Sequence, residues 1–289
     1  MASFWILLAS LLFSLMGVGV KLASSACPIS EIVLVRGLIG VALLGAMVRH
    51  RGGSLRTGVL AAHLWRGISG VVSLWLWFLA IASLPLATAV TLNYMSPVWT
   101  ACAVVVAGWW WQTGKRLEWP LLAAIGLSFA GVTLVLRPAF AAEQWSGALM
   151  ALASGMLASL SYVLVRRMSR EGEPGYRVVF YFSLVNVLAG ALGMLFDGAA
   201  VSLPGWRGAA LLVAVGVSGT VAQMALTRAY RTGKTLVVAN LQYSGIIFSS
   251  SWGILIWGDR FDWHVWLGMF VIMASGLAAT FYNLRRAAL

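Results

Sequence analysis

The sequence predicts an all-α membrane protein of ten transmembrane helices, arranged as two inverted five-helix repeats. Three observations support this prediction: an apolar composition, ten apolar runs of spanning length, and an internal repeat whose loops reverse their charge. Of the 289 residues, 61% are hydrophobic and 10% are charged, and the mean hydropathy is +0.90. Soluble domains carry about 25% charged residues. This chain therefore has too few polar side chains to cover a water-facing surface.

The apolar runs set the number of spans. A helix of about 20 apolar residues crosses a hydrocarbon core of roughly 30 Å and satisfies its own backbone polar groups. Runs of this kind recur along the whole chain and leave only short loops between them. We expect spans at residues 3–22, 30–48, 66–84, 87–108, 119–136, 147–165, 178–196, 208–227, 236–257 and 264–283.

The positive charges predict the orientation, because cytoplasmic loops of membrane proteins are enriched in Lys and Arg. With both termini in the cytoplasm of a bacterium, fifteen Lys and Arg lie on the inner side of the cell inner membrane and four on the outer side, while Arg36 falls inside the second span. A basic surface that binds nucleic acid would need a soluble domain, and the chain has no room for one. The inner set is Arg49, Arg51, Arg56, Arg66, Lys115, Arg116, Arg166, Arg167, Arg170, Arg177, Arg228, Arg231, Lys234, Arg285 and Arg286; the outer set is Lys21, Arg137, Arg207 and Arg260.

An internal repeat divides the chain into a first unit, residues 1–140, and a second unit, residues 141–289. Shifted by 149 positions, residues 67–94 align with 216–243 without a gap, and the matches include Gly70 with Gly219 and Tyr94 with Tyr243. Five spans per unit require the second unit to insert upside down. The charges of equivalent loops support this inversion. The basic loop 49–56 corresponds to the nearly neutral loop 197–205, and the uncharged loop 83–85 corresponds to the basic loop 231–234. Inverted repeats typically frame a midplane site that opens alternately to either side.

Polar residues interrupt the fourth and ninth spans at matching positions. Tyr94 lies in "TLNYMSP" (91–97), and Asn240, Tyr243 and Ser244 lie in "ANLQYSG" (239–245). Polar groups in hydrocarbon must face protein or water. They either form hydrogen bonds between helices or line one solvent-filled cavity as substrate-binding residues. Two further residues, Pro97 and Gly245, would loosen the two helices there and act as hinges.

Aromatic residues and one arginine complete the candidate substrate site. Trp75, Phe78 and Trp99 lie well inside spans, where they either pack in the core, face lipid or stack on a substrate; Trp99 needs a kink at Pro97 to reach the cavity of Tyr94. Arg36 is the sole formal charge well inside a predicted span. It would bind a substrate carboxylate, extend its guanidinium to the outer interface, or pair with Glu31.

The acidic residues all fall in loops or at the ends of spans, so a carboxylate relay of the kind that carries protons is not predicted. We therefore expect a facilitator or exchanger. No nucleophile–base pair and no cluster of metal ligands stands out, so no catalytic residue, metal site or cofactor is expected. A membrane-embedded enzyme and a non-transporting scaffold or receptor are the other classes of function considered.

The chain resembles the drug/metabolite transporter superfamily, and its EamA-type branch in particular. The resemblance covers the whole chain and depends on Arg36, on "NYMSPVW" with "GKRLEW" (114–119), and on "LQYSG" with "GDRFDW" (258–263). It implies a basket of helices around a central cavity, with spans five and ten at the periphery, in a monomer or homodimer. It also implies export of small metabolites by alternating access, with aromatic or neutral amino acids as the nearest substrate class. The alternatives are a carrier for nucleosides, sugars or riboflavin-like compounds, or a proton-coupled drug exporter.

Overall fold

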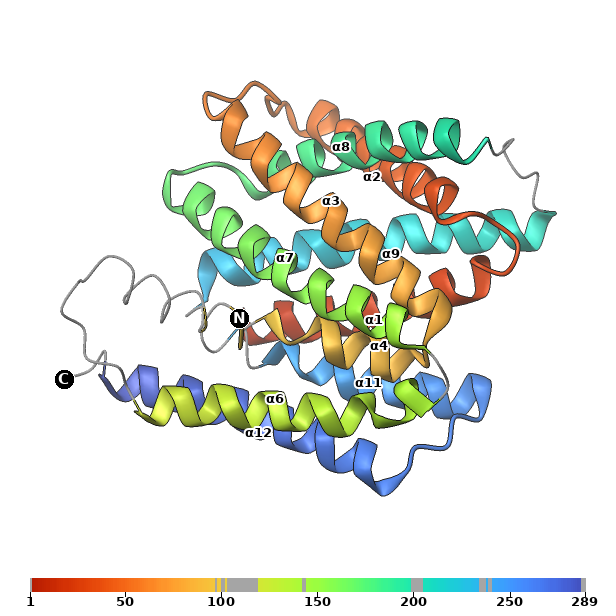
Figure 1. Ribbon diagram of the computed structural model, residues 1–289. Coiled ribbons are helices and arrows are strands. Elements are labelled where there is room, and N and C mark those ends of the chain that lie inside the picture. The colour runs from red at the N-terminus through yellow and green to blue at the C-terminus, as the bar shows by residue number, and fades with distance from the viewer. Residues whose placement is uncertain are drawn as a thin grey trace.

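The computed structural model describes residues 2–96, 98, 99, 102, 119–141, 144–198, 205–233, 238 and 241–286. These residues form ten α-helices and one short π-helix, and no strand occurs among them (Figure 1). The helices are α1 (Ala2–Ala23), α2 (Ile29–Arg51), α3 (Leu60–Ser83), α4 (Leu86–Asn93), α6 (Trp119–Ala141), α7 (Trp145–Arg170), α8 (Gly175–Asp197), α9 (Trp206–Thr232), α11 (Ser244–Trp252), η1 (Gly253–Trp257) and α12 (Trp263–Arg286).

Six of the described helices are long and apolar enough to cross a membrane: α1, α2, α3, α7, α8 and α9. Shorter apolar helical stretches cover residues 125–135, 244–257 and 263–275. These findings confirm the all-helical membrane class.

The ends of α2 and α8 follow the same local chemistry in both halves of the chain. Each helix begins directly after a proline in extended conformation, Pro28 or Pro174. Proline disfavours helical geometry in the residue before it but is compatible with the first turn after it. Each helix ends at a glycine in the left-handed region, Gly52 with φ 66° and Gly198 with φ 60°, where a side chain would be strained.

Helices from the two halves pack against one another throughout the bundle (Figure 1). In the described part of the chain, α1 packs along α9 and α3 packs along α7, while α2 packs against α8. The pair of α6 and α12 lies along one edge of the bundle. There Ser128 and Ser275 share a hydrogen bond of 2.6 Å, and Gly131 and Gly268 allow the two backbones to approach closely. Small residues at such crossings are typical of membrane helix pairs.

The fourth and ninth spans are interrupted near their polar residues. Helix α4 ends at Asn93, where Tyr94 caps it, and α11 begins at Ser244, directly after Tyr243. The two tyrosines therefore lie at helix ends rather than on the stripe of a continuous helix. Pro97 and Asn240 lie outside the described residues, as do 100, 101 and 103–108 of the predicted fourth span and 236, 237 and 239 of the predicted ninth span.

The third span begins earlier than predicted. Helix α3 starts at Leu60 rather than at residue 66, and His63 and Arg66 lie in its first two turns. Both side chains are buried. Arg66 is therefore not a loop residue facing water, and its assignment to the inner loops was wrong. The sequence from Leu60 to Trp65 contains no proline or glycine that would end the helix, so the helix continues beyond the strictly apolar run.

Candidate functional site

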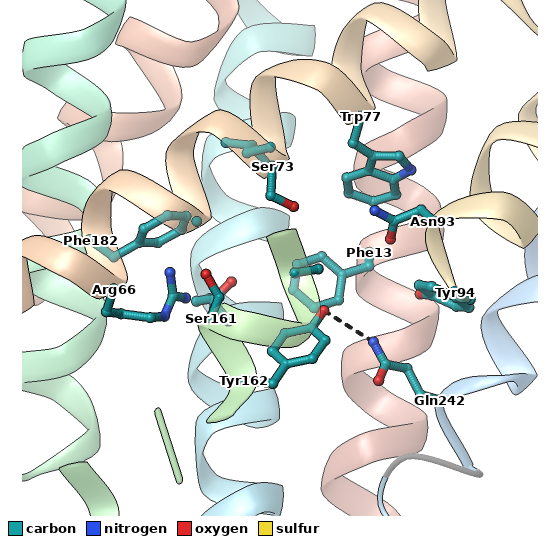
Figure 2. A pocket seen from close by; sticks show the side chains of 14 residues that line it. Phe13, Arg66, Ser73, Trp77, Asn93, Tyr94, Ser161, Tyr162, Phe182 and Gln242 are labelled. Atoms are coloured by element: carbon teal, nitrogen blue, oxygen red, sulfur yellow. Dashed lines mark hydrogen bonds between the residues drawn. The ribbon is translucent and has the colours of Figure 1, made fainter. Parts of the chain in front are cut away.

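A pocket lies in the middle of the bundle, between the two halves of the chain (Figure 2). It encloses about 490 Å³ of space free of protein atoms, including the space at its mouth. Helices α1, α3 and α4 contribute from the first half, and α7, α8, α9 and the segment before α11 contribute from the second. The lining residues are Phe13, Arg66, Gly70, Ser73, Leu74, Trp77, Asn93, Tyr94, Ala158, Ser161, Tyr162, Phe182, Gln223 and Gln242.

One wall of the pocket is a linked set of polar and aromatic side chains. The Gln242 amide nitrogen donates a hydrogen bond of 3.2 Å to the Tyr162 hydroxyl, and the Tyr230 hydroxyl donates one of 3.5 Å to the Gln242 carbonyl oxygen (Figure 2 shows the first). The Tyr162 and Tyr230 rings stack at 5.5 Å between centroids. Both bonds hold the same amide, so Gln242 is linked to α7 through Tyr162 and to α9 through Tyr230.

The opposite side is held by hydrogen bonds between α3, α4 and α7. The Asn93 amide nitrogen donates to the Ser154 hydroxyl, and the Ser73 hydroxyl donates to the Ser154 carbonyl oxygen at 2.8 Å. Gly155 lets the end of α4 approach α7, because a Cβ there would lie 2.6 Å from the Asn93 carbonyl oxygen. The bonds fix Asn93 at the point where α4 ends, with its side chain at the pocket (Figure 2).

The two predicted tyrosines occupy different places. Tyr94 lines the pocket, and Tyr243 is buried outside the lining, where its hydroxyl has no hydrogen-bond partner among the described residues. Ser244 is not among the lining residues, and its hydroxyl donates to the Leu241 carbonyl oxygen at 2.7 Å. A Cβ on Gly245 would lie 2.5 Å from the Tyr94 ring, so Gly245 is where α11 makes room for Tyr94. The hinge role of Gly245 stays a prediction.

The predicted aromatic residues lie beside the pocket rather than on it. Trp75 packs against Gly193 of α8, and Phe78 is fully buried in the core. Trp99 meets the Phe129 ring edge-on at 5.5 Å, toward α6. Trp77, the residue directly before Phe78, is the tryptophan described as lining the pocket, together with Phe13. The substrate roles of Trp75, Phe78 and Trp99 stay predictions.

Two arginines lie close to the ring of Phe182. The guanidinium carbon of Arg66 lies 4.3 Å from the ring centroid, and that of Arg36 lies 5.3 Å away. Each arginine is only 3% exposed. Arg66 lines the pocket, and Arg36 is not among the lining residues. Arg36 therefore does not extend to an interface, and the ion pairs of the described residues do not include it or Arg66.

A second group of buried charges lies at the end of the bundle where α3 and α8 begin. The Glu173 carboxylate accepts hydrogen bonds from His63 at 2.9 Å and from Arg177 at 3.1 Å. Burial raises the pKa of the Glu173 carboxyl, but bonds from His63, Thr57 and Arg177 outweigh it and lower that pKa below its usual value. Arg177 and Tyr181 also donate to carbonyl oxygens of Ser54 and Leu55, so the loop before α3 is bound to α8.

At the other end of the bundle, Lys21 joins α1 to the second half. Its ammonium donates to the Leu84 carbonyl oxygen at 2.5 Å and lies 5.3 Å from the Trp257 ring centroid. Burial raises the pKa of the nearby Asp259 carboxyl, and the charge of Lys21 acts in the opposite direction.

Sequence reasoning missed several pocket residues, mainly Arg66, Tyr162, Phe182 and Gln223. Tyr162 and Gln223 are polar residues inside largely apolar helices, which is the same signal that identified Tyr94. Arg66 was missed because it was placed in a loop. Phe182 carries no signal of its own in a chain this apolar.

The family model for the EamA-like transporter family matches residues 1–137 and, separately, residues 145–281. The chain belongs to the EamA-like transporter family. It is 31% identical to the pseudopaline exporter CntI of Pseudomonas aeruginosa over 277 residues, 94% of this chain and 93% of the relative. It is 23% identical to a riboflavin transporter of Vibrio cholerae, over 94% of this chain and 90% of the relative. An uncharacterized transporter of Helicobacter pylori is 28% identical over 94% of this chain and 92% of the relative.

A solved crystal structure of a protein 22% identical in sequence has the same fold. The TM-score is 0.71, and the similarity covers 97% of each chain. The chain is therefore a multi-pass membrane transporter of the EamA type. None of the three relatives named above is named for amino-acid transport.

Proposed function

We propose that this protein exports small metabolites across the inner membrane of a bacterium by alternating access through the central pocket. The observation that carries the proposal is the pocket between the two halves, lined from α1, α3 and α4 on one side and α7, α8 and α9 on the other. A site between two units can open to either face when the units rock against each other. The direction and the membrane are those expected from the similarity to the pseudopaline exporter of Pseudomonas aeruginosa.

The two units proposed to rock are the predicted inverted repeats, residues 1–140 and 141–289. The two separate matches of the family model, to 1–137 and 145–281, support this division. The packing is also reciprocal. By position in the repeat, α1 corresponds to α7 and α9 to α3, and α1 packs on α9 as α7 packs on α3. Helix α2 packs against α8, and α6 packs against α12; in each pair the two helices hold the same position in the repeat.

Both ends of the bundle carry contacts that cross between the halves. With both termini in the cytoplasm, the His63–Glu173 contact lies at the cytoplasmic end, and Lys21 with Trp257 lies at the outer end. The first residues of α1 and the last residues of α12 lie at the same end of the bundle, which supports a common side for the termini (Figure 1). Alternating access would require the two contacts to open in turn.

The transported solute is proposed as a small metabolite with polar and aromatic or apolar parts. Trp77, Phe13 and Leu74 provide apolar contact, and Asn93, Gln223 and Gln242 provide hydrogen bonds. Aromatic and neutral amino acids fit such a pocket. A riboflavin-like compound is the second candidate, favoured by the riboflavin transporter relative.

The residues described as lining the pocket include no carboxylate. A proton relay through membrane spans ordinarily uses Asp, Glu or His. We therefore propose a facilitator or exchanger rather than a proton-coupled drug exporter.

Flux through the purified protein in liposomes tests the proposal, with labelled tryptophan, phenylalanine, riboflavin and uridine as the solute panel. Ala158→Trp fills the pocket from α7, and Leu160→Trp places the same side chain on an exposed face of that helix. We expect uptake of at least one solute, abolished by Ala158→Trp and retained by Leu160→Trp. Uptake that both variants support equally would contradict the pocket as the route, and uptake that requires an imposed pH gradient would contradict the facilitator.

A further inference from the structure

Two buried cations at the pocket have no counter-charge within the described residues. The guanidinium groups of Arg66 and Arg36 both lie close to the ring of Phe182, and their charges repel each other. Nε and Nη1 of Arg66, and Nε of Arg36, have no hydrogen-bond partner among the described residues. A buried charge is stable in proteins when it is paired and its donors are satisfied. The quadrupole of Phe182 compensates only part of that cost.

The chain keeps space for these two guanidinium groups at equivalent positions of the repeat. A Cβ on Gly70 would clash with Nη1 of Arg66, and a Cβ on Gly219 would lie 2.9 Å from Nε of Arg36. Gly70 and Gly219 are the pair related by the shift of 149 positions. Glycine in the middle of a helix is unfavourable compared with alanine, so each is retained against the preference of its own helix. Each of the two glycines adjoins a buried arginine, and both arginines belong to the first half of the chain.

The Arg66 guanidinium is directed at the pocket. Figure 2 shows it beside Phe182 and pointing toward Ser161, which also lines the pocket. The Ser161 hydroxyl is already hydrogen-bonded to the Ser69 hydroxyl at 2.9 Å. The other polar side chains described as lining the pocket are hydroxyls and amides, which cannot neutralise a cation.

We infer that the pocket binds a carboxylate-bearing solute, with the carboxylate held by Arg66 and attracted by the charge of Arg36 near Phe182. This inference rests on the proposed function, because it names the class of solute that the same pocket would carry. Guanidinium groups bind carboxylates through charge-assisted hydrogen bonds. The aromatic side chains Trp77 and Phe13 would contact the apolar part of the solute. Uncharged metabolites leave the two cations uncompensated.

The test compares an acid with its uncharged amide and with an anion of different chemistry. Binding of 3-phenylpropionate, its uncharged amide 3-phenylpropanamide, and phenyl phosphate to the purified full-length protein is measured by isothermal titration calorimetry. We expect 3-phenylpropionate to bind about tenfold or more tightly than the amide, the ratio typical of a charge-assisted hydrogen bond to a buried group. Equal binding of acid and amide would overturn the inference. Tighter binding of phenyl phosphate would overturn the carboxylate assignment.

Variants connect the preference to Arg66. Arg66→Met removes the cation at nearly equal volume, and Gly70→Ala displaces the guanidinium without removing it; both should abolish the preference for the acid. Arg66→Lys retains the charge and should retain part of the preference. Arg231→Met changes an exposed arginine and is the matched control. An unchanged preference in a correctly folded Arg66→Met protein, judged by its elution and melting profile, would overturn the assignment.

The outcome separates this inference from the proposed function. Liposome uptake of riboflavin or uridine that is unaffected by Arg66→Met would support transport and overturn the carboxylate. Binding of 3-phenylpropionate that depends on Arg66, with no flux of any solute, would support the carboxylate site and contradict transport.

Discussion

Buried charges occur in two regions of this molecule, and the chain treats them in opposite ways. Where α3 and α8 begin, Glu173 lies between His63 and Arg177 and bonds to both. At the pocket, Arg66 and Arg36 face an aromatic ring, and three of their nitrogens have no partner in the described part of the chain. The first region pairs its carboxylate with its own residues, although Nδ1 of His63 has no hydrogen-bond partner among the described residues. The second region has no carboxylate within ion-pair distance of either arginine in the described part of the chain.

The comparison distinguishes a structural role from a binding role. Removing one member of a satisfied buried cluster leaves its partners uncompensated, so such a cluster supports the fold. Removing a cation that is already uncompensated takes away a cost instead. Substitution in the paired cluster should therefore lower stability, whereas substitution of the unpaired arginine at the pocket should mainly change ligand binding.

The largest expected effect on stability is at the paired cluster. Glu173→Ala should lower the free energy of unfolding by about 3 kcal/mol, because His63 and Arg177 lose their buried partner. Thermal denaturation in detergent measures it. Glu171→Ala is the matched control, since Glu171 forms an exposed pair with Arg167 that contributes at most about 1 kcal/mol. Equal losses in the two variants would show that the cluster has no special role.

Gly245→Ala should have the next largest effect on stability, because it disturbs the packing of Gly245 against Tyr94 at the pocket. The new methyl would lie 2.5 Å from the Tyr94 ring, and overpacking of this kind costs about 1–3 kcal/mol. The variant should lower both melting temperature and transport. Gly126→Ala, in open space on α6, should be neutral or slightly stabilising. A Gly245→Ala protein as stable and active as the wild type would contradict the close packing of Tyr94.

Arg66→Met should change stability by no more than about 1 kcal/mol, because the lost contact with Phe182 is offset by relief from burying a charge. The melting temperature in the absence of solute measures it, beside that of Arg231→Met. A destabilisation as large as that of Glu173→Ala would make Arg66 a structural residue, and the contrast between the two regions would disappear.

The smallest effect is the pH dependence of the cluster. The pKa of Glu173 is lowered by its three hydrogen-bond donors despite burial, so its contribution to stability is present above the ordinary glutamate pKa of about 4.3 and is lost as the pH falls through the lower pKa of the folded state. The stability difference between wild type and Glu173→Gln should therefore persist from neutral pH down to about 4.3 and vanish below it. Loss of the difference near neutral pH would contradict the lowered pKa.

The sequence predicted the site best where a polar residue interrupts an apolar run. Tyr94 was found in this way, and Asn93 and Gln242 lie in the same two segments. Trp77 could not be distinguished from Trp75 and Phe78, because neighbouring residues of a buried helix differ only in the direction they face. Arg66 was misplaced since the apolar run gives the hydrocarbon-spanning part of α3 and not the whole helix.

The sequence and the tertiary structure therefore determined different features of this protein. The sequence alone determined the class, because a chain with 10% charged residues must place its backbone in membrane-spanning helices, and its repeated motifs resembled those of the transporter family. Only the tertiary structure decided which side chains meet at the pocket. Apolar residues surround every helix here, on lipid and core faces alike, so sequence periodicity does not give the rotation of each helix. Packing between the halves sets that rotation and brings Arg66, Phe182 and Arg36 together.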